Sequence, residues 1–599
     1  MGETGGPPKQ QPTGGLPAAV GGPIAGQLPG RVRFAVRFAA GTSVAVLLAG
    51  YAVSALQRYL VNDDYQLLYL GWLTSLGKVP GVDFVAYSTH GLVHVLALLV
   101  SALGESLDAL VVGRWLMLLV LGGVALVAAR LTALLCGSTA GWFAPVLVGA
   151  STIMLNRALD LRPDLLTTLL WLWALHAATL QWVAPDSRAD RRRSIVIGLL
   201  LGFVLVNRFK GALACPFIAV LLLASASTPP GAWQARLQRV GRRFGVVVAA
   251  AAVPVVLYAL LLWSEGALSA FVRVNLDLWQ TLGQTADVGL DRSDTFALLL
   301  RHDGWWCAAA LVGGALRLWD ARRFDRRKNL SLLVLALLAA ASVWLNPAYY
   351  AYNLVTLLPL LVPMAAYLPA RLVETLATRW PSAEWLASLS AVAFGLAPLL
   401  FEVGSLSRIA LTSTNRHQRA LCEYLVHHTP ADYPVFALEG VGLFRPSVYH
   451  YRLQAVFRPR YERGDFDFRS ELRKTRPELV VLSYRIPGWL TAADRGFLAQ
   501  HYVPINRDFA VLGRQLRADG QETVELLRGG EFERMGATSC RVDEATVRLG
   551  QTLQLSAGRH VVAGGAGCGI RRHIPAEARA LLENPTVIPY VVGPGWLVP

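Results

Sequence analysis

Two adjacent carboxylates, Asp63 and Asp64, follow the first long apolar segment of this 599-residue chain, within the sequence Val61-Asn62-Asp63-Asp64-Tyr65. A carboxylate pair just beyond a helix end, at a membrane surface, can supply a general base that takes a proton from a substrate hydroxyl. The alternative is that the pair caps a helix in a solvated loop. Residue types alone favour the cap slightly.

Charged side chains stand together at two later places. Arg162-Pro163-Asp164 precedes one apolar segment, and Asn207-Arg208-Phe209-Lys210-Gly211 lies at the turn between two short ones. Arg208 and Lys210 can stabilise negative charge that develops on a substrate, or they can simply snorkel to the membrane interface. Arg162 and Asp164 either contact a substrate or form a structural pair at a helix start.

A metal site is the weaker interpretation of the two histidines nearby. His90 and His94 have the i,i+4 spacing that can hold a metal, but no neighbouring carboxylate or cysteine completes a first shell. We therefore expect no metal ligands here, and expect His90 to contact the acceptor or to pack against its surroundings.

The composition places these residues in a membrane protein. Hydrophobic residues make up 54% of the chain and charged residues 16%, whereas soluble proteins have about a quarter charged residues. The apolar residues come in long runs, which predicts a transmembrane helix bundle. The net charge is +16, but the arginines cluster beside the apolar runs as topology signals. A nucleic-acid partner is therefore excluded.

The apolar runs predict about eleven membrane spans. We place them at residues 38–56, 107–134, 140–155, 165–183, 194–206, 211–225, 244–263, 304–318, 330–345, 352–368 and 385–401. The run at 92–103 is too short to cross a bilayer, so we expect a juxtamembrane or re-entrant helix on the outer face.

Charge asymmetry gives the orientation. The basic segments 188–193, 236–243 and 317–328 all fall on the cytoplasmic side if the N-terminus is cytoplasmic. The C-terminal part then lies outside an inner or plasma membrane.

The chain divides into three parts. We predict a disordered cytoplasmic tail at residues 1–30, a transmembrane domain at 31–401 with a catalytic outer loop at 58–106, and an extracytoplasmic mixed α/β domain at 402–599. A β-rich subdomain is expected from about residue 540. Three of the six cysteines, Cys422, Cys540 and Cys568, lie in the outer domain, where an oxidising compartment permits one disulfide.

Four segments resemble the GT-C superfamily of membrane glycosyltransferases. The first outer loop of that superfamily is similar to two stretches here, the acidic pair with its tyrosine (Asp63-Asp64-Tyr65) and the later Pro80-Gly81-Val82-Asp83-Phe84. The others are Arg162-Pro163-Asp164, the Lys210 turn, and Asn346-Pro347 with Tyr349, Tyr350 and Tyr352 at the entry to a late helix. The resemblance covers roughly residues 31–368. It extends to protein O-mannosyltransferases, lipid A aminoarabinose transferases and many bacterial envelope glycosyltransferases.

The resemblance implies a function. The enzyme would transfer a sugar from a polyprenyl-phosphate donor to an extracytoplasmic glycan, lipid or protein hydroxyl, with inversion if the transfer is a single step. Asp63 or Asp64 would be the base, and Asp63 is favoured by its first position, although the family usually has Asp-Glu there. Arg208 and Lys210 would stabilise the leaving phosphate. Arg162, Asp164, Tyr65, His90 and Tyr352 would contact substrates. A divalent cation is compatible with this chemistry, because members of the superfamily differ in metal dependence.

Three alternatives belong to other classes. A transporter or flippase of lipid-linked sugars would use the carboxylates as ion sites, but it should carry charges in mid-span, and here they concentrate near the segment ends. A glycan polymerase or ligase of another membrane fold would also use outer Arg and Asp residues. A non-catalytic envelope scaffold would bind glycan through its outer domain. The sequence reveals neither the sugar nor the acceptor.

Overall fold

The computed structural model describes residues 28–85, 90–226, 233–282, 292–345, 353–411, 415–437, 442–448, 458–482, 488–506, 509–536 and 539–582. Most of the predicted N-terminal tail lies outside these residues, and so does Tyr352. The first helix, α1, begins at Gly30.

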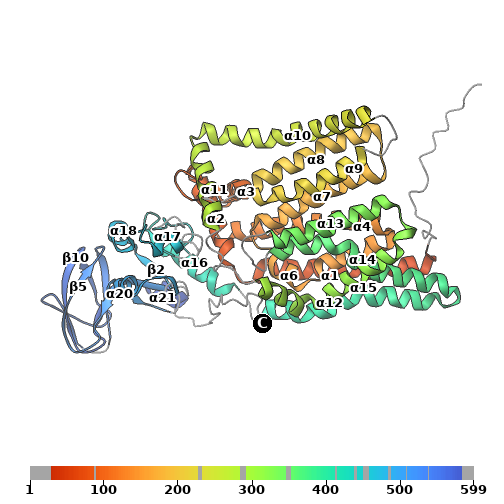
Figure 1. The fold of residues 1–599 in the computed structure, drawn as a ribbon. Coiled ribbons are helices and arrows are strands. Elements are labelled where there is room, and N and C mark those ends of the chain that lie inside the picture. The colour runs from red at the N-terminus through yellow and green to blue at the C-terminus, as the bar shows by residue number, and fades with distance from the viewer. Residues whose placement is uncertain are drawn as a thin grey trace, which may run out of the picture.

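Helices occupy all eleven apolar segments, and Figure 1 shows them packed side by side as a bundle. They are α1 (Gly30–Gln57), α4 (Asp108–Cys136), α5 (Ser138–Gly149), α6 (Thr152–Arg157), α7 (Pro163–Val183), α8 (Ser187–Asn207), α9 (Ala214–Ala226), α10 (Trp233–Ser264), α12 (Arg292–Trp319), α13 (Arg326–Trp344), α14 (Leu354–Arg379) and α15 (Glu384–Leu411). Six helical segments in the described chain are long and apolar enough to cross a membrane: α1, α4, α10, α13, α14 and residues 381–400. The chain is thus an integral membrane protein, and the count of eleven spans stays a prediction.

The segment expected at 140–155 is two helices, α5 and α6, instead of one. The start of α6 is capped both by a distant residue and by a local one. The carboxylate of Asp303 accepts hydrogen bonds from the backbone N–H groups of Thr152 (2.8 Å) and Ile153 (3.1 Å). Asp303 itself sits at a kink in α12, with φ −124° and ψ 28°. Ser151 adds a local cap, because its side chain accepts a hydrogen bond from the backbone N–H of Met154 (3.3 Å).

The first outer loop is mostly helical. Helix α2 (Asn62–Ser75) was not foreseen, whereas α3 (His90–Leu103) matches the short helix predicted there. The two helices pack closely at Gly71, where an added Cβ would come within 2.7 Å of the Cβ of Leu96. A further unforeseen helix, α11 (Leu268–Leu282), places Phe271 against Gly81 of this loop.

The outer domain has two sheets and several short helices, and its strands form a lobe beyond one end of the bundle (Figure 1). One sheet has the order β1-β2-β4-β11-β6-β9, with β3 also paired to β4, and the other has the order β5-β10-β7-β8. Only β1 and β2 pair in parallel among the described strands. The strands are β1 (Val435–Phe436), β2 (Leu479–Val481), β3 (Tyr502–Pro504), β4 (Phe509–Gln515), β5 (Gly520–Leu526), β6 (Gly530–Met535), β7 (Cys540–Val542), β8 (Ala545–Val547), β9 (Thr552–Leu555), β10 (Gly558–Gly564) and β11 (Gly569–Arg572).

The helices of this domain are α16 (Arg416–His428), α17 (Arg458–Glu462), α18 (Phe468–Thr475), α20 (Ala492–His501) and α21 (Ala576–Leu582). Strands follow one another without long helices from Tyr502 onward, earlier than the β-rich boundary expected near residue 540. Cys540 and Cys568 form a disulfide, and Cys422 is a buried cysteine outside that disulfide.

The outer domain and the first outer loop share one hydrophobic core. Side chains of α2 and α3, such as Leu68 and Leu96, belong to the same buried cluster as Leu421 and Leu425 of α16 and Val511 of β4. The outer domain is therefore packed onto the loop and is more than a tethered appendage.

The orientation can be tested directly. We expect a reporter fused after Phe401 to be extracytoplasmic and one inserted at residues 322–328 to be cytoplasmic, because the basic segments should stay inside. Alkaline phosphatase, which is active outside, and a fluorescent protein, which folds inside, make a suitable pair of reporters. Both positions on the same side would contradict the eleven-span arrangement.

Candidate functional site

Helix α7 places one wall of the site at its N-terminus. Arg162 is its N-cap residue with extended backbone, Pro163 occupies the first helical position, and Asp164 lies in the first turn. Proline suits that position because its missing N–H is not needed there, and a carboxylate is stabilised near a helix N-terminus. The Arg-Pro-Asp sequence therefore fixes where α7 starts and projects two opposite charges from that point.

Four charged side chains from three helices form a continuous chain of ion pairs. Asp63 of α2 pairs with Arg162, whose Nε also lies 3.2 Å from Oδ2 of Asp164. The other oxygen of Asp164 pairs with Arg208, which follows the last residue of α8. Residues that the sequence analysis selected from three separate segments thus meet in one place.

Asp63 is the accessible carboxylate of the acidic pair. Its side chain is 41% exposed, and Arg162 engages only its Oδ2 atom. Oδ1 accepts no hydrogen bond from any residue that the structure describes. One oxygen is oriented by a cation, and the other is open to a substrate hydroxyl.

Asp64, in contrast, is fully buried and its carboxylate is saturated. It pairs with Arg114 of α4 at 2.6 Å and accepts hydrogen bonds from the backbone N–H of Leu161 (2.7 Å) and of Val61 (3.2 Å). Asp64 therefore ties the start of α2 to α4 and to the segment before Arg162. This arrangement leaves little room for it to exchange protons with a substrate.

A second buried charge pair adjoins the pair of Asp64 with Arg114. Arg58 pairs with Asp160 and donates a hydrogen bond to the carbonyl of Asn156, and both charged side chains are almost fully buried. Arg114 in turn donates to the carbonyls of Arg58 and Tyr59, each at 2.8 Å. The Asp64–Arg114 and Arg58–Asp160 pairs therefore fix the backbone before Asp63 and the backbone before Arg162.

Sequence reasoning missed Arg58, Arg114 and Asp160. Arg114 carried a usable signal, because an ionisable residue inside an apolar run calls for a partner, and Asp64 is that partner. Arg58 and Asp160 lie between predicted segments, where charged residues are common, so nothing in their sequence context distinguished them.

Lys210 lies in the turn between the predicted spans 194–206 and 211–225, on the short helix η1 (Phe209–Leu213). Burial, followed by the charges of Arg208 and Arg162, lowers the pKa of this lysine to about 7. Cations that raise each other's electrostatic energy in this way would be stabilised by an anion among them. The turn is therefore a suitable place for a phosphate.

The remaining predicted residues are only partly placed. Helix α3 begins at His90, and a Cβ added at the next residue, Gly91, would lie 3.5 Å from the Cα of Asn207 beside Arg208. The backbone of His90 is thus next to the cationic turn, whereas its side chain lies outside the described part of the structure. Tyr352 is outside the described residues.

Tyr65 points away from the open part of the site. Its side chain is 1% exposed and lies beside the thiol of Cys422 in α16. Burial raises the pKa of that thiol to about 12, so it stays protonated at neutral pH. A substrate contact by Tyr65 remains a prediction.

No cluster of three or more His, Cys, Asp or Glu side chains suited to a metal occurs within the described residues. His94 instead lies against Tyr258, with ring centroids 6.1 Å apart. The charged groups around Asp63 are mainly cations, which suits an anionic substrate.

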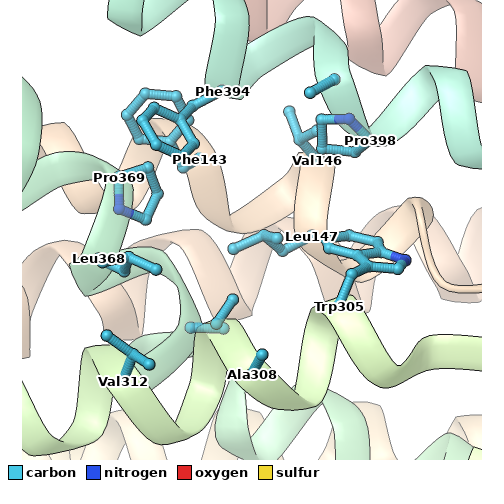
Figure 2. A pocket seen from close by; sticks show the side chains of 13 residues that line it. Phe143, Val146, Leu147, Trp305, Ala308, Val312, Leu368, Pro369, Phe394 and Pro398 are labelled. Atoms are coloured by element: carbon cyan, nitrogen blue, oxygen red, sulfur yellow. The ribbon is translucent and has the colours of Figure 1, made fainter. Parts of the chain in front are cut away.

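A separate cavity of about 380 Å³ lies between α5, α12, α14 and α15, and Figure 2 shows its lining side chains. The lining is almost wholly apolar, with Phe143, Trp305, Leu368 and Phe394 among its members. None of the predicted site residues lines it, and its side chains offer no acid–base chemistry.

Comparison with solved structures shows a shared fold. The structure of ArnT from Cupriavidus metallidurans bound to undecaprenyl phosphate matches with a TM-score of 0.53 and 13% identity, covering 79% of this chain and 97% of that chain. Its apo form matches with a TM-score of 0.52, with the same identity and coverage. An oligosaccharyltransferase from Archaeoglobus fulgidus matches with a TM-score of 0.46 and 11% identity, covering 77% of this chain and 72% of that chain.

ArnT and the archaeal enzyme are glycosyltransferases of the GT-C superfamily. No family model and no curated protein matches the sequence. The fold expected from the sequence resemblance, a GT-C-like helical membrane domain, is confirmed by the likeness to ArnT.

Proposed function

We propose that this chain is a membrane glycosyltransferase that transfers a sugar from a polyprenyl-phosphate donor to a hydroxyl of an extracytoplasmic acceptor. The observation that carries the proposal is the partly exposed carboxylate of Asp63, which ion pairs link through Arg162 and Asp164 to Arg208, with Lys210 in the same turn as Arg208. The shared fold with ArnT, whose structure holds undecaprenyl phosphate, supports it. The acceptor is a glycan, a lipid or a protein.

In this proposal Asp63 is the general base. Its open Oδ1 takes the proton of the acceptor hydroxyl as the hydroxyl oxygen attacks the anomeric carbon of the donor sugar. The bond between that carbon and the phosphate oxygen breaks, and its electron pair leaves with the polyprenyl phosphate. A single displacement of this kind inverts the anomeric centre. Arg162 holds the other oxygen of Asp63 and so orients the base.

Arg208 and Lys210 stabilise the leaving phosphate. Arg162 and Arg208 pair with Asp63 and Asp164, and Lys210 stands in the same turn as Arg208. An incoming phosphate would favour the charged form of Lys210, and donors that are already in place stabilise developing charge best. A sugar phosphate anchored by an isoprenoid would reach this turn at the level of the lipid headgroups.

The experiment that tests the function follows the leaving group. Purified protein is incubated with a panel of polyprenyl-phosphate-linked sugars and envelope extract, and released polyprenyl phosphate is measured by chromatography. Transfer from any of these donors releases the same polyprenyl phosphate, whichever sugar is moved and whichever acceptor receives it. The acceptor therefore does not need to be known. Movement of intact donor across proteoliposome membranes without any release would instead favour a transporter.

Lys210→Ala should weaken donor use while leaving the protein folded and inserted. We expect kcat/KM for the donor to fall by about tenfold, roughly the 1.4 kcal/mol of one charge-assisted hydrogen bond. Lys78→Ala, which removes an exposed lysine of the first outer loop, is the matched control and should leave kcat/KM unchanged. Unchanged donor KM and unchanged turnover in Lys210→Ala would make this lysine an interfacial anchor only.

A further inference from the structure

The outer domain holds the end of the helix that precedes the acidic pair. The backbone N–H of Asn415 donates to the carbonyl of Gln57 (2.8 Å), and its side-chain amide donates to the carbonyl of Leu56 (2.9 Å). Carbonyls in the last turn of a helix have no partner inside it. Asn415 therefore caps the C-terminal end of α1, although it lies more than 350 residues away in the sequence.

One turn further along α16, the side chain of Gln418 forms hydrogen bonds with the backbone of Leu60, just after α1. Its Oε1 accepts a hydrogen bond from the backbone N–H of Leu60 (2.6 Å), and its Nε2 donates to the carbonyl of the same residue (2.8 Å). An amide side chain has both a donor and an acceptor, so it satisfies both backbone groups of one residue. Gln418 is 9% exposed, which shields these bonds from competing water.

Leu60, which Gln418 binds, lies three positions before Asp63 in the sequence. Val61 is the N-cap of α2, and α2 begins at Asn62, so nothing but the cap separates Leu60 from the helix that carries Asp63. A shift of the Leu60 peptide would turn the first residues of α2. It would move Asp63 relative to Arg162, which is fixed separately at the start of α7.

The outer domain also holds the far half of α2. Tyr69 accepts a hydrogen bond from the backbone N–H of Ser447 (2.8 Å). Glu105 accepts one from Trp72 (3.0 Å) and pairs with the buried Arg445 (3.3 Å). The helix is thus held along its length, and Gln418 secures the end next to the acidic pair.

We propose that Gln418 is a positioning residue, through which the outer domain places Asp63 against its substrate. The inference rests on the proposed function. It explains why a domain of about two hundred residues shares a core with the first outer loop. Because the contact is to backbone, it sets the geometry of Asp63 without touching either substrate.

The test replaces Gln418 with methionine, which keeps the volume but removes both hydrogen bonds to Leu60. Small misplacements of a reacting group can cost about 10²-fold in rate, so we expect kcat to fall by about 10- to 100-fold. KM for the donor should change little, since Arg208 and Lys210 lie on other elements. Glu423→Ala, which changes an exposed residue of the same helix, is the control and should keep full kcat.

Hydrogen–deuterium exchange provides a readout that does not depend on activity. Gln418→Met should raise deuterium uptake in residues 58–64, and unchanged uptake there would overturn the contact itself. If uptake rises and kcat stays normal in an enzyme that Asp63→Asn inactivates, the positioning role is wrong. If Asp63→Asn has no effect on turnover, the proposed function fails. The exchange result would still show whether Gln418 holds the Leu60 backbone.

Where Gln418→Met does not fold, Gln418→Glu carries the same test. It retains the oxygen that accepts from the Leu60 N–H and loses the amide donor. We expect it to raise exchange in residues 58–64 and lower kcat, with donor KM again unchanged. Wild-type exchange and kcat in this variant would overturn the proposal.

Discussion

Asp63→Asn is expected to lower turnover by about two to four orders of magnitude, the range typical of a lost general base. Asparagine keeps the size of the side chain and most of its hydrogen bonding, but it cannot accept a proton at neutral pH. Asp63 is 41% exposed and lies at the outer end of the chain of ion pairs, and Arg162 keeps its second partner, Asp164, so thermal stability should fall only slightly. Donor KM should also be retained, because Arg208 and Lys210 are intact.

The measurement is release of polyprenyl phosphate at saturating donor, alongside a thermal unfolding curve of each variant. Asp83→Asn is a matched control, since Asp83 is another exposed carboxylate of the first outer loop and caps only the backbone of Val79 (2.7 Å). It should keep turnover within a few-fold. Full activity in Asp63→Asn, in Asp64→Asn and in the double variant would remove the loop from catalysis, and the transporter would become the leading alternative.

The sequence could predict several charged residues that meet at the candidate site, but it could not show how their surroundings differ. Hydropathy identified the apolar segments, and the charged groups that interrupt them include Asp63, Arg162 and Arg208, which do converge. Asp63 and Asp64 are identical in type and adjacent, so their different environments were invisible. The difference arises from Arg114 and the Leu161 N–H, which are brought to Asp64 by packing of α4 against the chain before α7.

Other features escaped because their causes are distant in sequence. Helix α2 has mixed composition, and its stability derives from α3 and from the outer domain, which packs against it. At the break between α5 and α6, Asp303, about 150 residues away, adds to the local cap from Ser151. Gln418 is one polar residue on an amphipathic helix, and only its position beside Leu60 reveals a specific role.

The second large effect concerns Asp64 and should appear as stability. Asp64→Asn leaves the guanidinium of Arg114 buried without its counter-charge, although the carbonyls of Arg58 and Tyr59 still accept from it. Breaking one partner of a buried pair costs about 3–5 kcal/mol. We therefore expect a loss of that order in the free energy of unfolding, measured by denaturant titration in detergent. Arg114→Met should cost a similar amount.

The double variant Asp64→Asn/Arg114→Met separates this role from catalysis. Removing both charges leaves no uncompensated ion, so the double variant should be more stable than either single one, and the two losses should not add. Below the unfolding temperature Asp64→Asn should keep turnover within about tenfold, because Asp63 still carries the proton. If Asp64→Asn instead retains wild-type stability and loses two or more orders of magnitude in turnover, the base is Asp64. Asp63 would then serve to hold Arg162 in place beside the phosphate.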